Sequence, residues 1–534
     1  MESDKIIRMP DIDFEPDPRG VGYVFYSCMK KFKNNIAQID GITGEKDSYE
    51  SLLQRCVRTA VKMRNMGVTH EDIISLCTFN HLNSCVPYIA TLFLGAKVSA
   101  LDATLSLQDS VHLLKQVNPK MVFTGVESVD LVEKALDQIK SNAKIIVFGP
   151  SNKYESFDKF IEPQIGEDDF EPYEVNDLQR TAFIFFSSGT SGLPKGICIH
   201  HYGYLCQHKN VLDFKFCQDI LFTFTSLYWV SGSSAVASTI MEGTARLIIP
   251  RFNEEQIWNA IEKFKPTMLL SVPFHFLSLH KTKPANVDTS SIQHIGIGGG
   301  PLIESQIRNF KEMFPTTEIY GGYGQTEMCV ILTIFKPSSE RDRELLKTRP
   351  TSCGTGIPGV WYKVVDVDSE ELLGPNQPGE LRLKTKFHLS EYYNMDSSHL
   401  WDSDGWYKTG DLVYYDEEKC FFVVDRLKEF LKFRSWHIPP ASIENVLLTH
   451  PEIFNALVIG IPHEFDENHL MALVVLKNKD TSLTPKDVEM YVEERVDERK
   501  RLLAGVRFVN NIPLATTGKV KRRDIKEMVL RGEL

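Results

Sequence analysis

Small hydroxylated residues and glycines follow an apolar run in the stretch TAFIFFSSGTSGLPKG, residues 181 to 196. The glycines allow the backbone to turn so that several N–H groups face one point, and such a nest binds anions. Pro194 stands where a Walker A loop would need glycine. We therefore interpret the stretch as a different phosphate-binding loop, and a flexible Gly/Ser surface loop is the alternative. Its candidate ligands are Ser187, Ser188, Gly189, Thr190, Ser191, Gly192 and Lys195.

Four further motifs follow in order along the chain: YGQTE at 323–327, YKTGD at 407–411, DRLKEFLK at 425–432 and TTGKVKRR at 516–523. Together with the loop, they resemble the nucleotide, metal, ribose, hinge and lysine motifs of the adenylate-forming superfamily. The resemblance is strongest to insect luciferase-like acyl-CoA synthetases and plant 4-coumarate–CoA ligases. It covers residues 181 to 523 by motif, whereas the first 180 residues match only in general character.

The resemblance implies that the enzyme joins a carboxylate to AMP. Both the attacking carboxylate and the α-phosphate of ATP are negatively charged, so the reaction needs cations and positioned donors around phosphorus. By resemblance, the motifs assign Mg²⁺ binding to Glu327 and Thr190, both of which offer hard oxygen ligands. They assign contact with the α-phosphate to Thr326. Without the resemblance, we would interpret Glu327 as an acid favoured at a helix N-terminus.

The nucleoside is expected between two further segments. An ionised carboxylate accepts from two hydroxyls at once, so Asp411 is the candidate for the ribose, although an Asp after Gly is otherwise a common turn residue. Glycines after a strand let a flat adenine or an acyl group approach, or simply form a strand-to-helix turn. Tyr323 is the candidate for stacking on the base. The expected nucleotide contacts are Gly298, Gly299, Gly300, Tyr323, Gly324, Gln325 and Asp411.

A mobile C-terminal lid carries the remaining catalytic candidates. By resemblance, Lys519 reaches the carboxylate and the α-phosphate when the lid closes, and Arg426 reaches the ribose or phosphate. Lys432 belongs to a second face of the lid that serves the later half-reaction with the thiol of CoA. The alternative for Lys519 is a solvated lysine of a basic tail, because three cations follow it at 521–523.

Two stretches depart from the family pattern. Ser435 and Trp436 occupy a position where relatives carry glycine in the loop that lines the pantetheine tunnel, which puts CoA transfer in question. The expected acyl-pocket residues are Tyr228, Trp229 and Ser231, where many relatives have histidines; the indole is either a pocket wall or core filling. Residues 181–245 contain no arginine, so we do not expect efficient use of beetle luciferin.

The elements that position these residues alternate between helix and strand. Apolar spacing predicts helices at 48–66, 254–265 and 303–314, and short apolar runs predict buried strands at 121–125, 143–148 and 267–272. The stretch 317–327 predicts a strand that opens into a loop. The apolar stretch 85–101 is broken by Pro87, Gly95 and Lys97, and is interpreted as a buried helix. This alternation predicts an α/β fold with parallel sheets and ligands at the carboxyl ends of strands.

The chain of 534 residues is too long for one core. From about residue 346 the pattern becomes strand-rich, which predicts a small β subdomain, and the tail is α+β. We expect a large AMP-binding domain at 1–424, a hinge at 425–428 with Asp425 and Lys428 as its pivot, and a mobile C-terminal lid at 429–534.

A net charge of −11 argues against a general nucleic-acid binder. No apolar leader, membrane span or CxxC pair is visible, so we expect reduced thiols and a cytoplasmic protein. A peroxisomal location stays open, although the C-terminus RGEL is not the SKL signal. A cluster of cysteines and histidines directly after the phosphate loop fits no standard zinc spacing, and we expect a helix to begin there: Cys198, His200, His201, Cys206 and His208.

The leading hypothesis is therefore an acid–CoA ligase that uses ATP, Mg²⁺ and CoA and acts on a fatty or aryl acid. A luciferase-type monooxygenase that adenylates a luciferin and oxidises it with O₂ shares every nucleotide residue. A catalytically silent relative that only binds an acyl or nucleotide ligand is the third hypothesis. The acyl specificity and the oligomeric state do not follow from the sequence.

Overall fold

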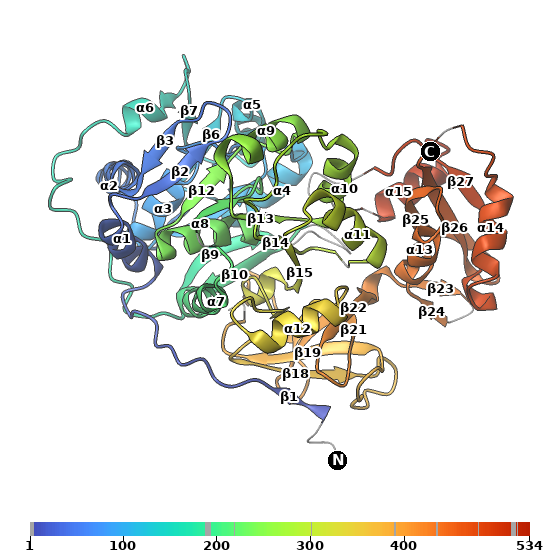
Figure 1. Cartoon of the computed structure of the whole chain (residues 1–534). Helices are drawn as coiled ribbons and strands as arrows, with labels where there is room; N and C mark the ends of the chain where they lie inside the picture. The colour runs from blue at the N-terminus through green and yellow to red at the C-terminus, as the bar shows by residue number, and fades with distance from the viewer. Residues whose placement is uncertain are drawn as a thin grey trace.

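The structure of the chain is a computed structural model that describes residues 5–186, 194–217, 219–300, 302–388, 391–433, 436–478, 480–513, 520 and 522–534. A large N-terminal domain carries three sheets, and a smaller C-terminal domain lies on one side of it (Figure 1). The α/β architecture predicted from the sequence is confirmed. Within these residues, every helix is too short or too polar to cross a membrane.

The first large sheet has eight strands in the order β20-β10-β9-β5-β4-β6-β7-β8. The six strands from β9 to β8 in this order pair in parallel. Strand β10 pairs antiparallel with both of its neighbours, β9 and β20. The strands are β4 (Ile73–Cys77), β5 (Lys97–Leu101), β6 (Met121–Gly125), β7 (Lys144–Phe148), β8 (Glu155–Ser156), β9 (Thr181–Phe186), β10 (Gly196–His200) and β20 (Glu391–Tyr392).

The second large sheet has nine strands in the order β17-β16-β15-β14-β13-β11-β12-β2-β3. Its central pairs are parallel, and its two ends are antiparallel. The strands are β2 (Ile36–Asp40), β3 (Lys46–Ser48), β11 (Ile220–Phe222), β12 (Ala245–Ile248), β13 (Met268–Ser271), β14 (His294–Ile297), β15 (Glu318–Tyr323), β16 (Thr333–Ile334) and β17 (Thr355–Gly356).

Helices cover both large sheets in layers, and the buried clusters show which helix serves which face. One core lies between the sheets and holds α1 (Val21–Lys31), α2 (Tyr49–Asn65), α3 (Val86–Phe93), α7 (His201–Phe214) and α8 (Val230–Glu242). A second core packs α9 (Glu254–Phe264), α10 (Pro273–Thr282) and α11 (Glu304–Met313) on the nine-stranded sheet. A third packs α4 (Leu107–Val117) and α5 (Val129–Gln138) on the eight-stranded sheet.

The β subdomain is a five-stranded antiparallel sheet in the order β1-β18-β19-β21-β22. Its strands are β1 (Ile7–Arg8), β18 (Val360–Val365), β19 (Gly379–Thr385), β21 (Tyr407–Tyr415) and β22 (Phe421–Arg426). The N-terminal β1 therefore pairs with a strand more than 350 residues later in the chain. The remaining helices of the large N-terminal domain are α6 (Phe157–Phe160) and α12 (Glu340–Thr348).

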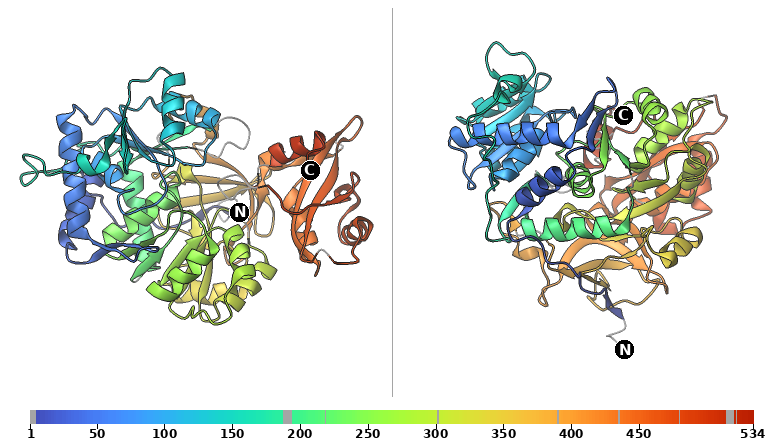
Figure 2. Two further views of the ribbon diagram at one scale, coloured as in Figure 1. Left: turned by 90° about the horizontal axis from the view of Figure 1, so that it is seen from above. Right: turned by 60° about the vertical axis from the view of Figure 1, so that its left-hand side comes forward.

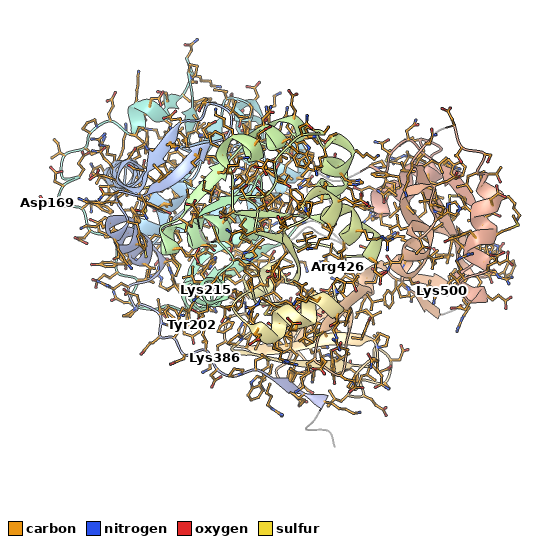
Figure 3. The ribbon with its side chains drawn as sticks, viewed as in Figure 1. Asp169, Tyr202, Lys215, Lys386, Arg426 and Lys500 are labelled. Atoms are coloured by element: carbon orange, nitrogen blue, oxygen red, sulfur yellow. The ribbon has the colours of Figure 1, made fainter. Side chains whose placement is uncertain are left out.

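The C-terminal domain begins after Arg426, which lies at the junction between the two domains (Figure 3). It contains the pair β23 (Leu431–Phe433) and β24 (Trp436–Ile438) and a sheet of β25 (Ile453–His463), β26 (Glu467–Leu476) and β27 (Val506–Phe508). Helices α13 (Pro440–Leu448), α14 (Pro485–Glu493) and α15 (Arg522–Leu530) pack around that sheet. A second view shows the domain standing clear of most of the large domain (Figure 2).

Two expectations about local structure were wrong. The apolar stretch 85–101 is not one helix, because α3 ends at Phe93 and Lys97–Leu101 forms β5 in the centre of the sheet. Gly95 adopts a φ of 65° there, which a turn accepts and a helix does not. The helix expected directly after the phosphate loop begins only at His201, since β10 returns antiparallel to β9 first.

Candidate active site

A cavity of about 990 Å³ opens at the carboxyl ends of strands from both large sheets. Residues at the ends of β9, β13, β14 and β15 line the cavity, and residues of β21 in the β subdomain line it as well. Arg426 and Lys428, at the junction with the C-terminal domain, also line it. Ligands bind at this edge in α/β proteins because the loops that follow the strands converge there.

Asp411 lies at the centre of a hydrogen-bonded cluster in this cavity. The hydroxyl of Tyr323 donates to its Oδ2 at 2.7 Å, and Nε2 of Gln325 donates to the same oxygen at 2.6 Å. Nε of Arg426 lies 3.3 Å from Oδ1. Gln325 also donates to the carbonyl of Thr409 at 2.9 Å, so it joins the turn after β15 to the β subdomain. These contacts hold the carboxylate in one orientation.

Glu327 lies in the short 3₁₀ turn Thr326–Met328 that follows β15. Burial raises the pKa of its carboxyl, because removal from water disfavours the charge. The hydroxyl of Tyr392 approaches its Oε1 at 3.3 Å, and Nζ of Lys195 lies 5.1 Å from the centroid of the Tyr392 ring. A partly buried carboxylate offers the hard oxygen ligands that a divalent cation such as Mg²⁺ prefers. Thr190, the other expected Mg²⁺ ligand, lies outside the described residues.

The turn that follows Glu327 is strained, and Gln207 holds it. Cys329 and Val330 have φ angles of 64° and 142°, which side chains other than glycine rarely adopt. Gln207, fully buried on α7, donates from Nε2 to the carbonyls of Met328 at 2.8 Å and Ile331 at 3.0 Å. The two bonds bracket the strained pair. No local pattern in the sequence indicated Gln207, because its partners are more than 120 residues away.

The strained turn also explains one glycine of the YGQTE motif. A Cβ atom at Gly324 would lie 1.8 Å from the carbonyl oxygen of Val330, so no other residue fits there without moving the turn. Gly298 and Gly299 follow β14 and line the cavity, and Gly299 has a φ of 83°. Gly300 packs against Pro273 instead, and it is not part of the described lining.

The phosphate loop is fixed at its C-terminal end by α4. Nε2 of His112 and Nε2 of Gln116 lie 2.9 and 2.8 Å from the carbonyl of Pro194, and Oε1 of Gln116 accepts from the amide of Gly196 at 3.1 Å. Lys195 lines the cavity. The loop residues Ser187, Ser188, Gly189, Thr190, Ser191 and Gly192 lie outside the described residues, so their phosphate contacts stay a prediction.

One part of the cavity lining, which we call the aromatic end, carries the aromatic side chains Phe224, Trp229 and Phe252. Trp229 and Ser231 line it, whereas Tyr228 lies in the core behind Trp229, with the two rings edge to face at 4.8 Å. His275 stacks on Phe252, with ring centroids 4.2 Å apart, and its Nδ1 lies 2.7 Å from Oγ of Ser271. Burial lowers the pKa of His275 to about 4, so the imidazole is neutral at physiological pH.

Lys432, the residue expected to serve the later half-reaction, lies apart from this arrangement. Lys432 lies on β23 with an exposed side chain, and it is not part of the described lining. The carboxylate of Asp425 accepts from the amide of Ala441 at 3.1 Å, which fixes the start of α13. Lys519 and Ser435 lie outside the described residues, and the backbone of Trp436 begins β24. Their roles, and the hinge at 425–428, stay predictions.

The histidines after the phosphate loop are structural, as expected. Nδ1 of His200 accepts from the amide of Gly203 at 2.7 Å and caps α7. Nδ1 of His201 accepts from the amide of Val21 at 3.1 Å, and His208 bonds to the carbonyl of Tyr204 and to Ser234. Each ring therefore makes a structural hydrogen bond to a different neighbour.

Comparison with known proteins agrees with this geometry. The family model of AMP-binding enzymes matches residues 25–393, and that of the AMP-binding enzyme C-terminal domain matches residues 442–519. The chain therefore belongs to the AMP-binding enzyme family, and the resemblance to adenylate-forming enzymes is confirmed.

Within that family, the chain is 30% identical to a luciferin 4-monooxygenase of Nipponoluciola cruciata over 99% of its own length and 98% of that protein. It is 29% identical to a probable CoA ligase, CCL5, of Humulus lupulus, covering 96% and 93% of the two chains. The luciferase-like enzyme from the nonluminescent mealworm Zophobas morio superposes with a TM-score of 0.75 at 36% identity, over 80% of this chain and all of that one.

Proposed function

We propose that the protein is an acid–CoA ligase that forms AMP. In the first step, an oxygen of the substrate carboxylate bonds to the α-phosphorus of ATP as pyrophosphate leaves. In the second, the thiol of CoA attacks the acyl carbon, AMP leaves and the thiol proton is released. The observation that carries the proposal is that Asp411, Arg426 and Glu327 face one cavity whose lining also includes the aromatic side chains of Phe224, Trp229 and Phe252. One cavity thus offers a place for a nucleotide beside an acid.

The described residues suit distinct parts of ATP. Asp411 keeps two oxygens oriented by Tyr323, Gln325 and Arg426, and an oriented carboxylate accepts from the hydroxyls of a ribose. Glu327 would hold Mg²⁺, which would neutralise charge on the phosphates and orient them. Thr326, one residue before it, lines the same cavity, which supports its assignment as a donor to the α-phosphate. Lys519 is assigned to the reacting oxygens by resemblance alone.

The aromatic end of the cavity supports a substrate with a flat or apolar body. Trp229, Phe224 and Phe252 supply aromatic surface, and the neutral pair of His275 and Ser271 supplies hydrogen bonding without a net charge. A hydroxyl or carbonyl group on the substrate acid can form a hydrogen bond with this His275–Ser271 pair. We therefore infer an aryl acid, or a medium-chain acid that carries an uncharged polar group.

A panel of carboxylic acids incubated with ATP, Mg²⁺ and CoA tests the proposal, with acyl-CoA detected by mass spectrometry and pyrophosphate by a coupled assay. We expect acyl-CoA from at least one aryl or substituted medium-chain acid. A Lys519→Ala variant should lose the first step, whereas Lys521→Ala, two residues further along the same basic tail, should retain it. Absence of pyrophosphate release with every acid would refute the proposal and leave the silent ligand-binding relative.

A luciferin monooxygenase is the second candidate, because several curated relatives that match nearly the whole chain are luciferin 4-monooxygenases. No arginine occurs between residues 181 and 245 to hold a luciferin. We therefore rank the ligase first. Light on addition of beetle luciferin, ATP and Mg²⁺, at a yield comparable with a beetle luciferase, would reverse this ranking.

A further inference from the structure

Two histidines and an aspartate converge at the tip of the β25–β26 hairpin in the C-terminal domain. His463 ends β25, Asp466 lies in the connecting turn and His469 follows on β26. One potential ligand atom of each residue lies within 4.8 Å of those of the other two. The three residues, which we call the tip cluster, are not among the residues that line the cavity of Asp411 and Glu327.

The geometry of the tip cluster brings three side chains to one point. Oδ2 of Asp466 lies 2.8 Å from Nε2 of His469 and 3.6 Å from Nδ1 of His463. The two imidazole rings stack at 3.7 Å with an interplanar angle of 14°. All three side chains are partly exposed, so an ion can reach them from solvent and small rotations can bring the ligand atoms closer.

The backbone of the turn is unusual as well. Glu467 has a φ of 65°, in the left-handed region that glycine usually occupies. The amide of Asp466 donates to Nδ1 of His463 at 3.2 Å, and the amide of Asn468 donates to the carbonyl of Asp466 at 2.8 Å. This tight turn folds the carboxylate back towards the two rings. Strained backbone of this kind often accompanies ligand clamps.

We propose that the tip cluster binds a divalent transition-metal ion of the Zn²⁺ class through His463, Asp466 and His469. Two imidazoles and a carboxylate are a common ligand set for zinc, with water in the fourth position. Mg²⁺ and Ca²⁺ prefer oxygen ligands alone, so the two nitrogens select against them. A carboxylate can keep one oxygen on the metal and use the other elsewhere, so further contacts of Asp466 are compatible with ligation.

Binding there would brace the C-terminal domain. The metal would join the end of β25 to β26 across the turn. Nδ2 of Asn468, one residue before His469, donates to the carbonyl of Lys432 at 2.8 Å, so β26 is also tied to β23. An ion at the tip therefore stabilises the strand that carries Lys432. This inference does not depend on the proposed ligase activity.

Titration of the full-length protein with Co²⁺ tests the proposal, because the visible spectrum of Co²⁺ reports nitrogen and oxygen ligation. We expect saturation at one ion per chain, displacement by Zn²⁺ and no displacement by millimolar Mg²⁺. The variants His463→Asn, Asp466→Asn and His469→Asn should each weaken binding by about tenfold or more. His450→Asn is the matched control: His450 lies in the same domain, where its ring meets Tyr491 edge to face, away from the tip cluster.

A second readout separates metal binding from folding. Zn²⁺ should raise the thermal midpoint of the wild type and of His450→Asn, but not that of the three tip-cluster variants. Circular dichroism of the metal-free variants should match the wild type. Non-saturating Co²⁺ binding, or equal binding by the wild type and His463→Asn, would show that the tip cluster is only a surface His–Asp network and would overturn the proposal.

Discussion

Gln207 gives the sharpest test of how the site is held together. Substitution by methionine keeps the length of the side chain and removes both bonds to the carbonyls of Met328 and Ile331. A buried carbonyl that loses its partner costs about 1–3 kcal/mol, so the variant loses roughly 2–6 kcal/mol of support for the turn. Two non-glycine residues at positive φ cost about 1–3 kcal/mol each. The free energy of the backbone strain is similar to the free energy that the two hydrogen bonds supply. Without these bonds, the backbone of the turn should therefore move to a less strained conformation.

Relaxation of the turn should reach the nucleotide. Cys329 and Val330 follow Glu327 after Met328, and the carbonyl oxygen of Val330 lies close to Gly324. Movement of the turn therefore displaces Glu327 and the segment that bears Gln325. We expect Gln207→Met to raise KM for ATP and to lower kcat. If the transition state loses about 1.4 kcal/mol of stabilisation, kcat/KM for ATP falls about tenfold. The effect on KM for the acid should be smaller.

Pyrophosphate exchange at varied ATP measures this effect, and thermal unfolding reports stability separately. Asn210→Leu is the matched control, because buried Asn210 lies on the same helix and also donates to a backbone carbonyl, that of Pro358 at 3.2 Å. It should lower the thermal midpoint without changing KM for ATP. The reasoning fails if Gln207→Met keeps the wild-type KM and kcat, or if Asn210→Leu changes them equally.

Three further predictions concern the two ends of the cavity and the core. Asp411→Asn removes the charge that meets Arg426, and kcat/KM for ATP should fall about 10- to 100-fold in the exchange assay, with little change in KM for the acid. Trp229→Ala should shift the acid panel towards bulkier acids, since the indole lines the cavity; an unchanged order of preference would contradict this role. Burial raises the pKa of Glu242 to about 7, so the folded state holds this proton more tightly than the unfolded state and stability falls as pH rises from about 4.5 to 7. Glu242→Gln should therefore match the wild type in free energy of unfolding near pH 4.5 and exceed it at pH 8 by about 1–2 kcal/mol, a value reduced because Glu242 is partly exposed. Thermal unfolding at both pH values measures this, and a constant difference at all pH values would contradict the assignment.

The sequence predicted the elements whose signals are local. Helix α9 runs from Glu254 to Phe264, as the apolar spacing and Pro266 indicated, and Asn253 caps it through the amide of Gln256. Strands β6 and β7 are buried and parallel, as their short apolar runs indicated. The prediction failed at 85–101, because apolar residues are equally common in a buried helix and in a central strand.

By itself, the sequence determined the chemical inventory: the glycine and hydroxyl loop, the acid of YGQTE, the carboxylate of YKTGD and the order of the motifs. Such signals are readable because they depend on residues a few positions apart. Only the tertiary structure decided that Asp411 meets Tyr323, 88 residues earlier, and that Gln207 holds the turn at Cys329 and Val330. Those contacts join segments through packing, and the free energy that selects them is spread over the whole core, so no single stretch of residues reveals them.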